Sequence, residues 1–140
     1  MKKIHLKLLQ YLNKDLAPGF SPYYIYLIYL GSEVVGKIVL REGSCEERYF
    51  DGHIGYSIYY EHRGHNYAYL ACLELLKIAK EKGFKELIIT CSPGNIASLK
   101  TIEKLPSSFI EKKSIPSQIK KLFFEDENEK LIYKIKLEDL

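Results

Sequence analysis

The sequence predicts a mixed α/β (α+β) fold, in which a mostly antiparallel sheet of about six or seven strands has helices on its faces. Two observations predict this fold. The first part of the chain alternates apolar and polar residues in strand-length runs that are separated by turn residues, as antiparallel strands do. The middle of the chain then places one long stretch of helical periodicity between two strand-like runs, which indicates a central βαβ crossover.

The length and composition are those of one globular domain, which we expect to cover residues 1–140. Hydrophobic residues make up 46% of the chain and charged residues 28%, an ordinary balance for such a protein. The 21 basic and 18 acidic side chains are interspersed, so the net charge of +3 creates no strong basic field and argues against nucleic acid as a partner. We also expect no membrane span and a cytoplasmic location, because long apolar runs and leader-like features are absent.

The cysteines and histidines give no metal-binding pattern. Cys45, Cys72 and Cys91 are widely spaced and include no Cys-x-x-Cys pair, which predicts reduced thiols. His62 and His65 flank a turn that has no carboxylate or thiolate at ligand spacing. The sequence therefore predicts no metal site.

The first half of the chain reads as four strands. Alternating Ile4, Leu6 and Leu8 indicate a half-buried strand, and the Gly31-Ser32 turn joins two later runs as a hairpin. A polar loop then precedes a run rich in Ile and Tyr, which pack well on a pleated surface. The expected strands span residues 3–9, 24–30, 34–41 and 53–60.

The second half begins with the crossover. Apolar residues at helical spacing predict a long amphipathic helix over residues 67–82, which Gly83 ends. A buried strand over 85–91 follows, and a shorter helix over 96–105. Alternation predicts two more strands, near 109–112 and 131–137, and the segment between them is ambiguous between a short helix and a loop.

The turn before the long helix, RGHNYA at residues 63–68, has the composition of an anion site. A helix start exposes backbone N–H groups without partners, and the aligned peptide dipoles leave partial positive charge there. Phosphate binds well at such an end. The alternative interpretation is a plain loop with an N-cap, which is common at helix starts.

Two motifs in this order resemble the GNAT superfamily of acetyl-CoA-dependent N-acetyltransferases. In that family the turn carries Arg or Gln, two variable residues, Gly, one variable residue, and then Gly or Ala. Here Arg63 and Ala68 match, Asn66 stands where the family has glycine, and Gly64 falls where many members have glycine. The second motif, NIASLKTIEKL, is similar to the family's later Asn-x-x-Ser/Ala…Glu-Lys helix, through residues Asn95, Ser98, Glu103 and Lys104.

The resemblance implies acetyl-CoA as co-substrate, without a metal, and direct attack by an amine within a ternary complex. Backbone N–H groups of 65–68 would hold the pyrophosphate, and the backbone of 56–58 would pair with pantetheine. The implied acceptor is a small-molecule or peptide amine. The resemblance therefore implies the following cofactor-binding residues: Ile58, Arg63, Gly64, His65, Asn66, Tyr67, Ala68, Asn95 and Ser98.

The catalytic groups are less clearly marked. Many family members use a tyrosine on the second helix to protonate the leaving thiolate, but here Ile102 holds that position. Tyr56 and Tyr60 are the candidate donors, and Asp51 and His53 are the candidate bases. Cys91 follows the crossover near the expected thioester, and a structural role suits it better than a nucleophilic one.

Other functions stay open at this stage. A non-catalytic acyl-CoA-binding or regulatory module is one alternative, and a small interaction domain is another. The segment between the first two strands is short and lacks the two helices that often form the acceptor wall in the family. The acceptor site is therefore either open or completed by a second subunit of a homodimer, and the sequence does not identify the acceptor.

Overall fold

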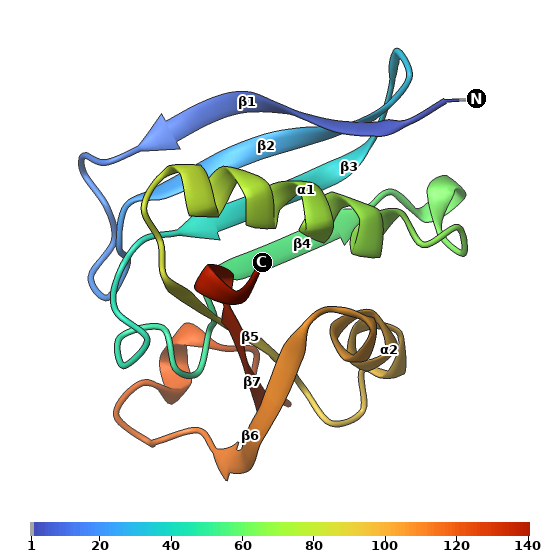
Figure 1. Ribbon diagram of the computed structural model, residues 1–140. Coiled ribbons are helices and arrows are strands. Elements are labelled where there is room, and N and C mark those ends of the chain that lie inside the picture. Colours follow the sequence, from blue (N-terminus) through green and yellow to red (C-terminus); the bar gives the residue numbers. More distant parts are fainter. Residues whose placement is uncertain (1) are drawn as a thin grey trace.

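Seven strands form two antiparallel sheets in the computed structural model, which describes residues 2–140 (Figure 1). The first sheet has the order β1-β2-β3-β4, and the second has the order β5-β7-β6. The strands are β1 (Ile4–Leu12), β2 (Tyr23–Leu30), β3 (Glu33–Arg41), β4 (Ile54–Ile58), β5 (Glu86–Cys91), β6 (Ser107–Ser114) and β7 (Glu129–Lys136). The helices are α1 (Tyr67–Glu81) and α2 (Ile96–Lys104), with short 3-10 turns η1 (Tyr60–His62), η2 (Lys120–Leu122) and η3 (Leu137–Asp139).

The predicted fold class is confirmed, but the strands form two sheets where the sequence predicted one, and the other differences lie at the ends of elements. Strand β1 continues to Leu12, and β4 is shorter than predicted because the 3-10 turn η1 follows it. Strand β6 is longer than predicted because it pairs along β7, from Ser107 opposite Ile135 to Ser114 opposite Glu129. Pairing with a neighbouring strand outweighs the weak β-propensity of SSFIEKKS. The ambiguous segment before β7 contains η2 and turns.

Helix α1 packs its apolar stripe against one face of the first sheet (Figure 1). The buried positions of α1 recur every three or four residues, as the period of a helix requires, and are Ala71, Cys72, Leu75, Leu76 and Ala79. Ile28, Ile38 and Leu40 are fully buried side chains of the sheet in the same core. Each such aliphatic side chain stabilises the fold by about 1.5–3 kcal/mol. This packing fixes the start of α1 beside the end of β4.

The two sheets meet where β4 begins. The backbone N–H of His53 donates to the Ile88 carbonyl at 2.8 Å, and the Ile88 N–H donates to Nδ1 of the His53 ring at 2.8 Å. Beyond this point β4 and β5 share no ladder, because β4 pairs with β3 and β5 pairs with β7. The sequence predicted these two strands as neighbours, and the structure adds that they are joined at one end and belong to different sheets.

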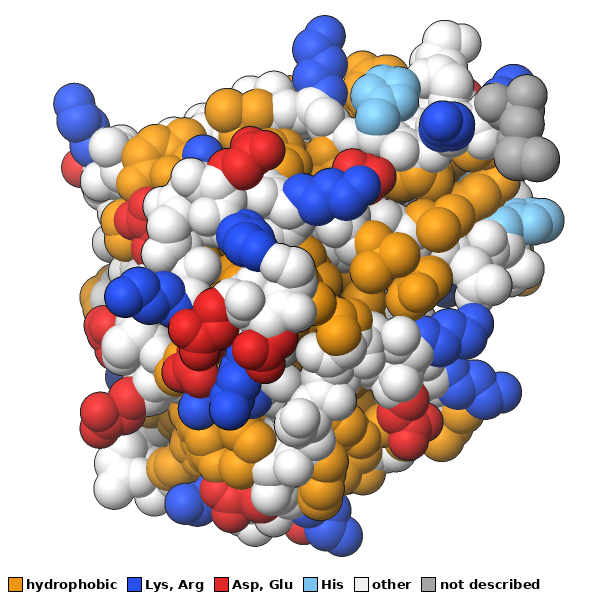
Figure 2. Space-filling view, in the orientation of Figure 1, with side chains coloured by type: hydrophobic (Ala, Val, Ile, Leu, Met, Phe, Trp, Pro, Cys, Tyr) orange, Lys and Arg blue, Asp and Glu red, His pale blue; other side chains and the backbone are white. Residues whose placement is uncertain are grey.

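The surface mixes both signs of charge. Figure 2 shows acidic and basic side chains interspersed on the face that carries α1, with apolar surface between them. Across residues 2–140, neither helix is long and apolar enough to cross a membrane.

Candidate functional site

The turn between β4 and α1 contains two residues in the left-handed region. Gly64 has a φ of 88° and Asn66 a φ of 62°. A Cβ at Gly64 would meet no atom within 4 Å, so the backbone conformation and not the space around it favours glycine there. Asparagine is one of the few other residues that adopt this conformation readily. Asn66 therefore keeps the shape of the turn without glycine.

The N-terminus of α1 has no side-chain cap. The Asn66 carbonyl accepts the Leu70 N–H at 3.1 Å, but the Asn66 side chain makes no capping hydrogen bond. Its Oδ1 instead accepts a hydrogen bond from Lys104 Nζ at 2.7 Å. The first turn of α1 also contains no acidic residue. The unpaired N–H groups and the positive end of the helix dipole are therefore available to an anion.

A cavity of about 550 Å³ lies over this helix start. It is bounded by β4 and the turn on one side and by α2 on the other. The structure brings the predicted cofactor-binding residues together here, namely Ile58, Arg63, Gly64, Asn66, Tyr67, Ala68, Asn95 and Ser98. His65 is exposed and is not part of the lining, although its ring stacks on Tyr67 with centroids 5.3 Å apart.

Helix α2 adds two cations that were not among the predicted cofactor-binding residues, although Lys104 belongs to the second motif. Lys100 and Lys104 line the cavity on the side of α2, and Arg63 lines it on the side of the turn. Lys100 and Lys104 are four residues apart, which places them on one face of the helix. This spacing is the signal in the sequence that could have identified them. Three basic side chains and one helix start thus bound a single cavity, which suits a ligand that carries several negative charges.

The start of α2 and the strand β4 are joined through Tyr56. Asn95 caps α2 because its Oδ1 accepts the Ser98 N–H at 3.2 Å. The hydroxyl groups of Ser98 and Tyr56 are hydrogen-bonded at 2.7 Å. Burial raises the pKa of Tyr56, although its hydrogen bonds to Ser98 and Thr101 act in the opposite direction. Tyr56 therefore keeps its proton at neutral pH inside the cavity, as a proton donor must.

His53 lies outside this cavity and is 1% exposed. Since Nδ1 accepts the Ile88 N–H, Nε2 carries the proton and donates it to the Gly43 carbonyl at 2.8 Å. Burial is the main reason that the pKa of His53 is lowered. Both ring nitrogens are occupied by backbone groups, which gives His53 a clear structural role. Its predicted role as a base stays a prediction.

The neutral state of His53 predicts a pH-dependent stability. Because the folded protein lowers this pKa below 6.5, the stabilisation is complete above pH 6.5 and is lost as the pH falls. We expect the free energy of unfolding to decrease by up to about 1.4 kcal/mol per pH unit in that range. Denaturant titrations from pH 7 to 5 should show a flatter profile for His53→Gln than for wild type. The exposed His5→Gln serves as the control, and a slope unchanged by His53→Gln would contradict the assignment.

Asp51 lies in a different cavity from Tyr56. Its Oδ2 pairs with Nη1 of Arg48 at 2.8 Å. The three predicted catalytic residues therefore do not share one cavity. Asp51 lines one cavity, His53 is buried where the two sheets meet, and Tyr56 lines the other cavity. The sequence placed them within six positions, but the backbone directs their side chains to different environments.

Ile102 and Cys91 both belong to the core. Ile102 is fully buried, so the position that often carries a donor in related proteins here serves packing. Burial raises the pKa of Cys91, and its thiol therefore remains protonated at neutral pH. This agrees with a structural role for the cysteine.

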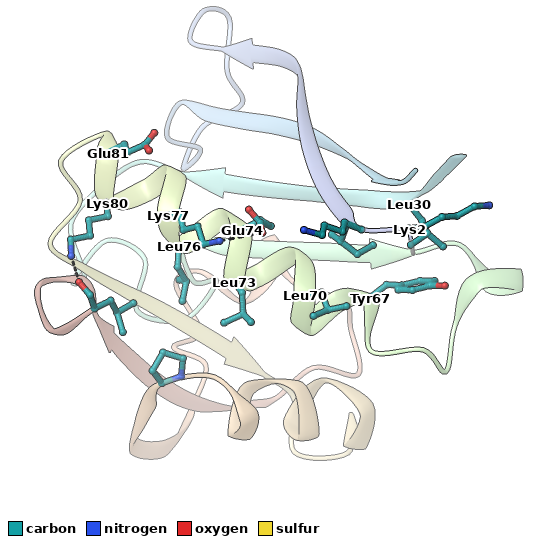
Figure 3. Close-up of a pocket in the computed structure, with 14 residues that line it drawn as sticks. Lys2, Leu30, Tyr67, Leu70, Leu73, Glu74, Leu76, Lys77, Lys80 and Glu81 are labelled. Carbon is teal, nitrogen blue, oxygen red and sulfur yellow. Dashed lines mark hydrogen bonds and ion pairs between the residues drawn. The ribbon is translucent and has the colours of Figure 1, made fainter. Parts of the chain in front are cut away.

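A larger hollow of about 1290 Å³ lies along the opposite side of α1 (Figure 3). Leu70, Leu73 and Leu76 line it, so it is largely apolar. Its rim carries both signs of charge, from Lys77 and Lys80 and from Glu74 and Glu81. It shares only Tyr67 with the cavity at the helix start. The predicted anion site is therefore in the smaller cavity, where the turn, the helix start and α2 meet.

Comparison with known proteins identifies the domain. Residues 6–106 match the family model described as an acetyltransferase (GNAT) domain. No curated protein matches the chain significantly by sequence.

Several solved structures share the fold. One is RimL, a ribosomal L7/L12 alpha-N-protein acetyltransferase in complex with coenzyme A, with a TM-score of 0.65 and 16% identity over 81% of this chain and 62% of that one. Another is the microcin C7 self-immunity acetyltransferase MccE in complex with acetyl-CoA and AMP, with a TM-score of 0.64 and 16% identity over 81% and 61%. A GNAT-family acetyltransferase from Bacillus anthracis has a TM-score of 0.64 and 25% identity over 81% and 66%. The chain thus spans about 62% of the length of RimL.

Proposed function

The chain belongs to the GNAT acetyltransferase family, and from this premise we propose that it transfers the acetyl group of acetyl-CoA to an amine. The observation that carries the proposal is the uncapped start of α1, which faces a cavity bounded by Arg63, Lys100 and Lys104. A CoA pyrophosphate needs such a combination of free N–H groups, positive dipole and cations. The CoA and acetyl-CoA complexes of RimL and MccE support the choice of ligand.

The pantetheine arm would continue from the pyrophosphate along β4. Ile58 and Tyr56 line the cavity from the strand, and Asn95 and Ser98 line it from α2. Because β4 and β5 are joined by His53 at one end and share no ladder beyond it, the edge of β4 that faces β5 is left for the pantetheine amides, except at the Ile58 carbonyl, which accepts a hydrogen bond from Arg63 Nε at 3.0 Å. The acetyl group would then lie near Tyr56.

The reaction needs one attack and two proton transfers. The neutral amine nitrogen attacks the thioester carbonyl carbon, the carbon–sulfur bond breaks, and the thiolate leaves with the electron pair. We assign Tyr56 as the donor that protonates this thiolate, since its phenol is protonated in the cavity. The proton that the amine loses goes to the base. Of the two candidates, Asp51 retains Oδ1 without a hydrogen bond to any residue in 2–140, whereas both nitrogens of His53 are engaged.

Two measurements test the function. Acetyl-CoA at 100 times its Kd is expected to stabilise the protein by about 2.7 kcal/mol, seen as a raised Tm. Free-thiol release with a panel of amines then tests turnover. A raised Tm together with no thiol release for any amine would favour the non-catalytic acyl-CoA-binding module. The buried Ile102 at the usual donor position is the observation that supports this alternative. An unchanged Tm would contradict both.

The contact between Asn66 and Lys104 gives a prediction about CoA affinity. Asn66→Gly is expected to preserve or tighten binding, because glycine adopts the same backbone conformation and Lys104 Nζ is released toward the phosphates. Lys104→Met is expected to weaken binding by about tenfold, or roughly 1.4 kcal/mol. Calorimetry with CoA measures both. A loss beyond about tenfold in Asn66→Gly would instead identify the asparagine side chain as a ligand contact.

We also propose a cytoplasmic location, which the three free cysteines support, since two of them are buried thiols without a disulfide partner.

Whether a second subunit completes the acceptor site is tested by the molecular mass in solution, measured with and without acetyl-CoA. A dimer in either state would support the shared site.

A further inference from the structure

A second cavity lies at the other end of β4, where the loops between β1 and β2, between β3 and β4, and between β6 and β7 come together (Figure 1). Its volume is about 520 Å³, which is within the range of small-molecule sites. Aromatic and aliphatic side chains line it from all three loops and from the start of β2, namely Phe20, Tyr23, Phe50, Ile119, Leu122 and Phe123. The cavity therefore suits the apolar body of a small ligand.

Part of this apolar lining is open to solvent at the mouth of the cavity. Phe20 is 54% exposed and Leu122 is 44% exposed. The two loops that carry them approach each other closely, since a Cβ at Gly19 would lie 3.3 Å from Cδ1 of Leu122. A ligand that covers these side chains removes apolar surface from water, which favours binding.

The charged residues of the lining include more carboxylates than guanidinium groups. Arg48 is paired with Asp51, from Nη1 to Oδ2 at 2.8 Å. Arg41 donates from Nη1 to backbone carbonyls of the loop before β4, at 3.3 and 3.1 Å. Glu46 and Glu47 add two further carboxylates to the lining. Three carboxylates thus stand against two guanidinium groups, which favours a cation over an anion.

Glu46 is the lining carboxylate that has no partner. Oε1 of Glu47 accepts the Ser44 N–H at 2.9 Å in its own loop, and Oδ2 of Asp51 is held by Arg48. The side chain of Glu46 is exposed and forms no hydrogen bond or ion pair with any residue in 2–140. A protonated amine would give this carboxylate a partner of opposite charge.

The cavity also reaches β4 beside Tyr56. Arg41 lines the cavity, and its guanidinium lies over Gly55, because a Cβ at Gly55 would be 2.8 Å from Nη2 of Arg41. Successive residues of a strand point to opposite faces of the sheet, so Gly55 and Tyr56 face opposite sides of β4. A ligand in this cavity is therefore next to the strand that lines the cofactor cavity, on the face opposite the Tyr56 phenol.

We propose that this cavity binds the acceptor, and that the acceptor is a small amine with an aromatic or branched aliphatic body and no carboxylate. Its apolar body packs against Phe50, Leu122 and Phe123, and its ammonium group lies near Glu46. The ammonium group releases one proton to water at the open mouth, and the neutral amine then attacks as described above. The identification of the ligand as the acceptor rests on the proposed acetyl transfer, but the amine site does not.

The test uses three probes that separate the amine from the apolar body. Phenethylamine has both groups, 2-phenylethanol lacks the amine, and phenylalanine adds a carboxylate. Calorimetry on the full chain, with and without saturating CoA, is expected to show about fivefold tighter binding, or more, of phenethylamine than of either other probe. CoA has no acetyl group to transfer, so this experiment measures binding alone.

Two variants assign the contacts. Glu46→Gln is expected to remove most of the preference for phenethylamine over 2-phenylethanol. Glu125→Gln is the matched control, because it removes an exposed carboxylate of the β6–β7 loop outside the cavity lining, and it should keep the preference. Leu122→Ala is expected to weaken both probes equally, since it removes apolar surface alone. All three side chains are exposed, so these changes leave the core intact.

Nuclear magnetic resonance on the wild-type protein locates the probe independently of any variant. The backbone amide signals of Phe50 and Gly55 are expected to shift on addition of phenethylamine. Equal binding of phenethylamine and 2-phenylethanol, tighter binding of phenylalanine, no binding at millimolar concentration, or unmoved Phe50 and Gly55 signals would overturn the proposal. Binding of phenethylamine at these residues without thiol release from acetyl-CoA would support the amine site and count against the proposed transfer alone.

Discussion

Replacing Tyr56 with phenylalanine is expected to lower the turnover of acetyl transfer by about 100-fold or more, the usual contribution of a general acid. The phenol lies in the cofactor cavity, and burial raises its pKa, so it is a donor that remains protonated until the thiolate forms. The Kd for acetyl-CoA should stay within about threefold of wild type, because the ring that packs against the core is retained. Stopped-flow or steady-state thiol release measures the rate, and calorimetry measures the Kd.

The matched control is Ser98→Ala. It removes the same hydrogen bond of 2.7 Å but leaves the phenolic proton in place. If proton donation is the role of Tyr56, Ser98→Ala retains most of the turnover. Equal losses in the two variants would show that the hydrogen bond positions α2 and that Tyr56 donates no proton.

Asp51→Asn tests the base, since retention of full turnover by that variant across the pH range would exclude Asp51 as the base.

Replacing Ala68 with glutamate is expected to weaken acetyl-CoA binding by about 100-fold. Ala68 lies in the first turn of α1 and lines the cavity, so the new side chain takes up space and places a negative charge beside the pyrophosphate. Two like charges about 4 Å apart near a protein surface repel by several kcal/mol, which exceeds the roughly 2.7 kcal/mol that a 100-fold loss requires. Calorimetry with CoA on a variant that melts cooperatively gives the answer.

Leu70→Glu is the control for Ala68→Glu. It adds the same charge to the same end of α1, but Leu70 is 38% exposed and lines the hollow on the other side of the helix. Its affinity for CoA is expected to change little. If Ala68→Glu binds CoA as well as wild type does, the pyrophosphate is not at this helix start.

The elements that depend on local sequence were predicted well. Helix α1 has its predicted start at Tyr67 and ends one residue before the predicted end, because its apolar period and Gly83 are readable from neighbouring residues. The Asn95 cap is local in the same sense, since donor and acceptor are three residues apart. The β2–β3 hairpin likewise follows from one glycine turn between two strand-like runs. In these cases the groups that interact are close in the sequence.

The sequence by itself therefore determined the order of elements, the position of the turn before α1 and the family. The tertiary structure decided which side chains meet. Lys104 contacts Asn66 across 38 positions, Tyr56 contacts Ser98 across 42, and the His53 ring reaches Ile88 across 35. The separation of Asp51, His53 and Tyr56 also depends on how the loops pack. Local pattern carries no information on such contacts, because they form only when the core of α1 and the two sheets sets the distance between distant segments.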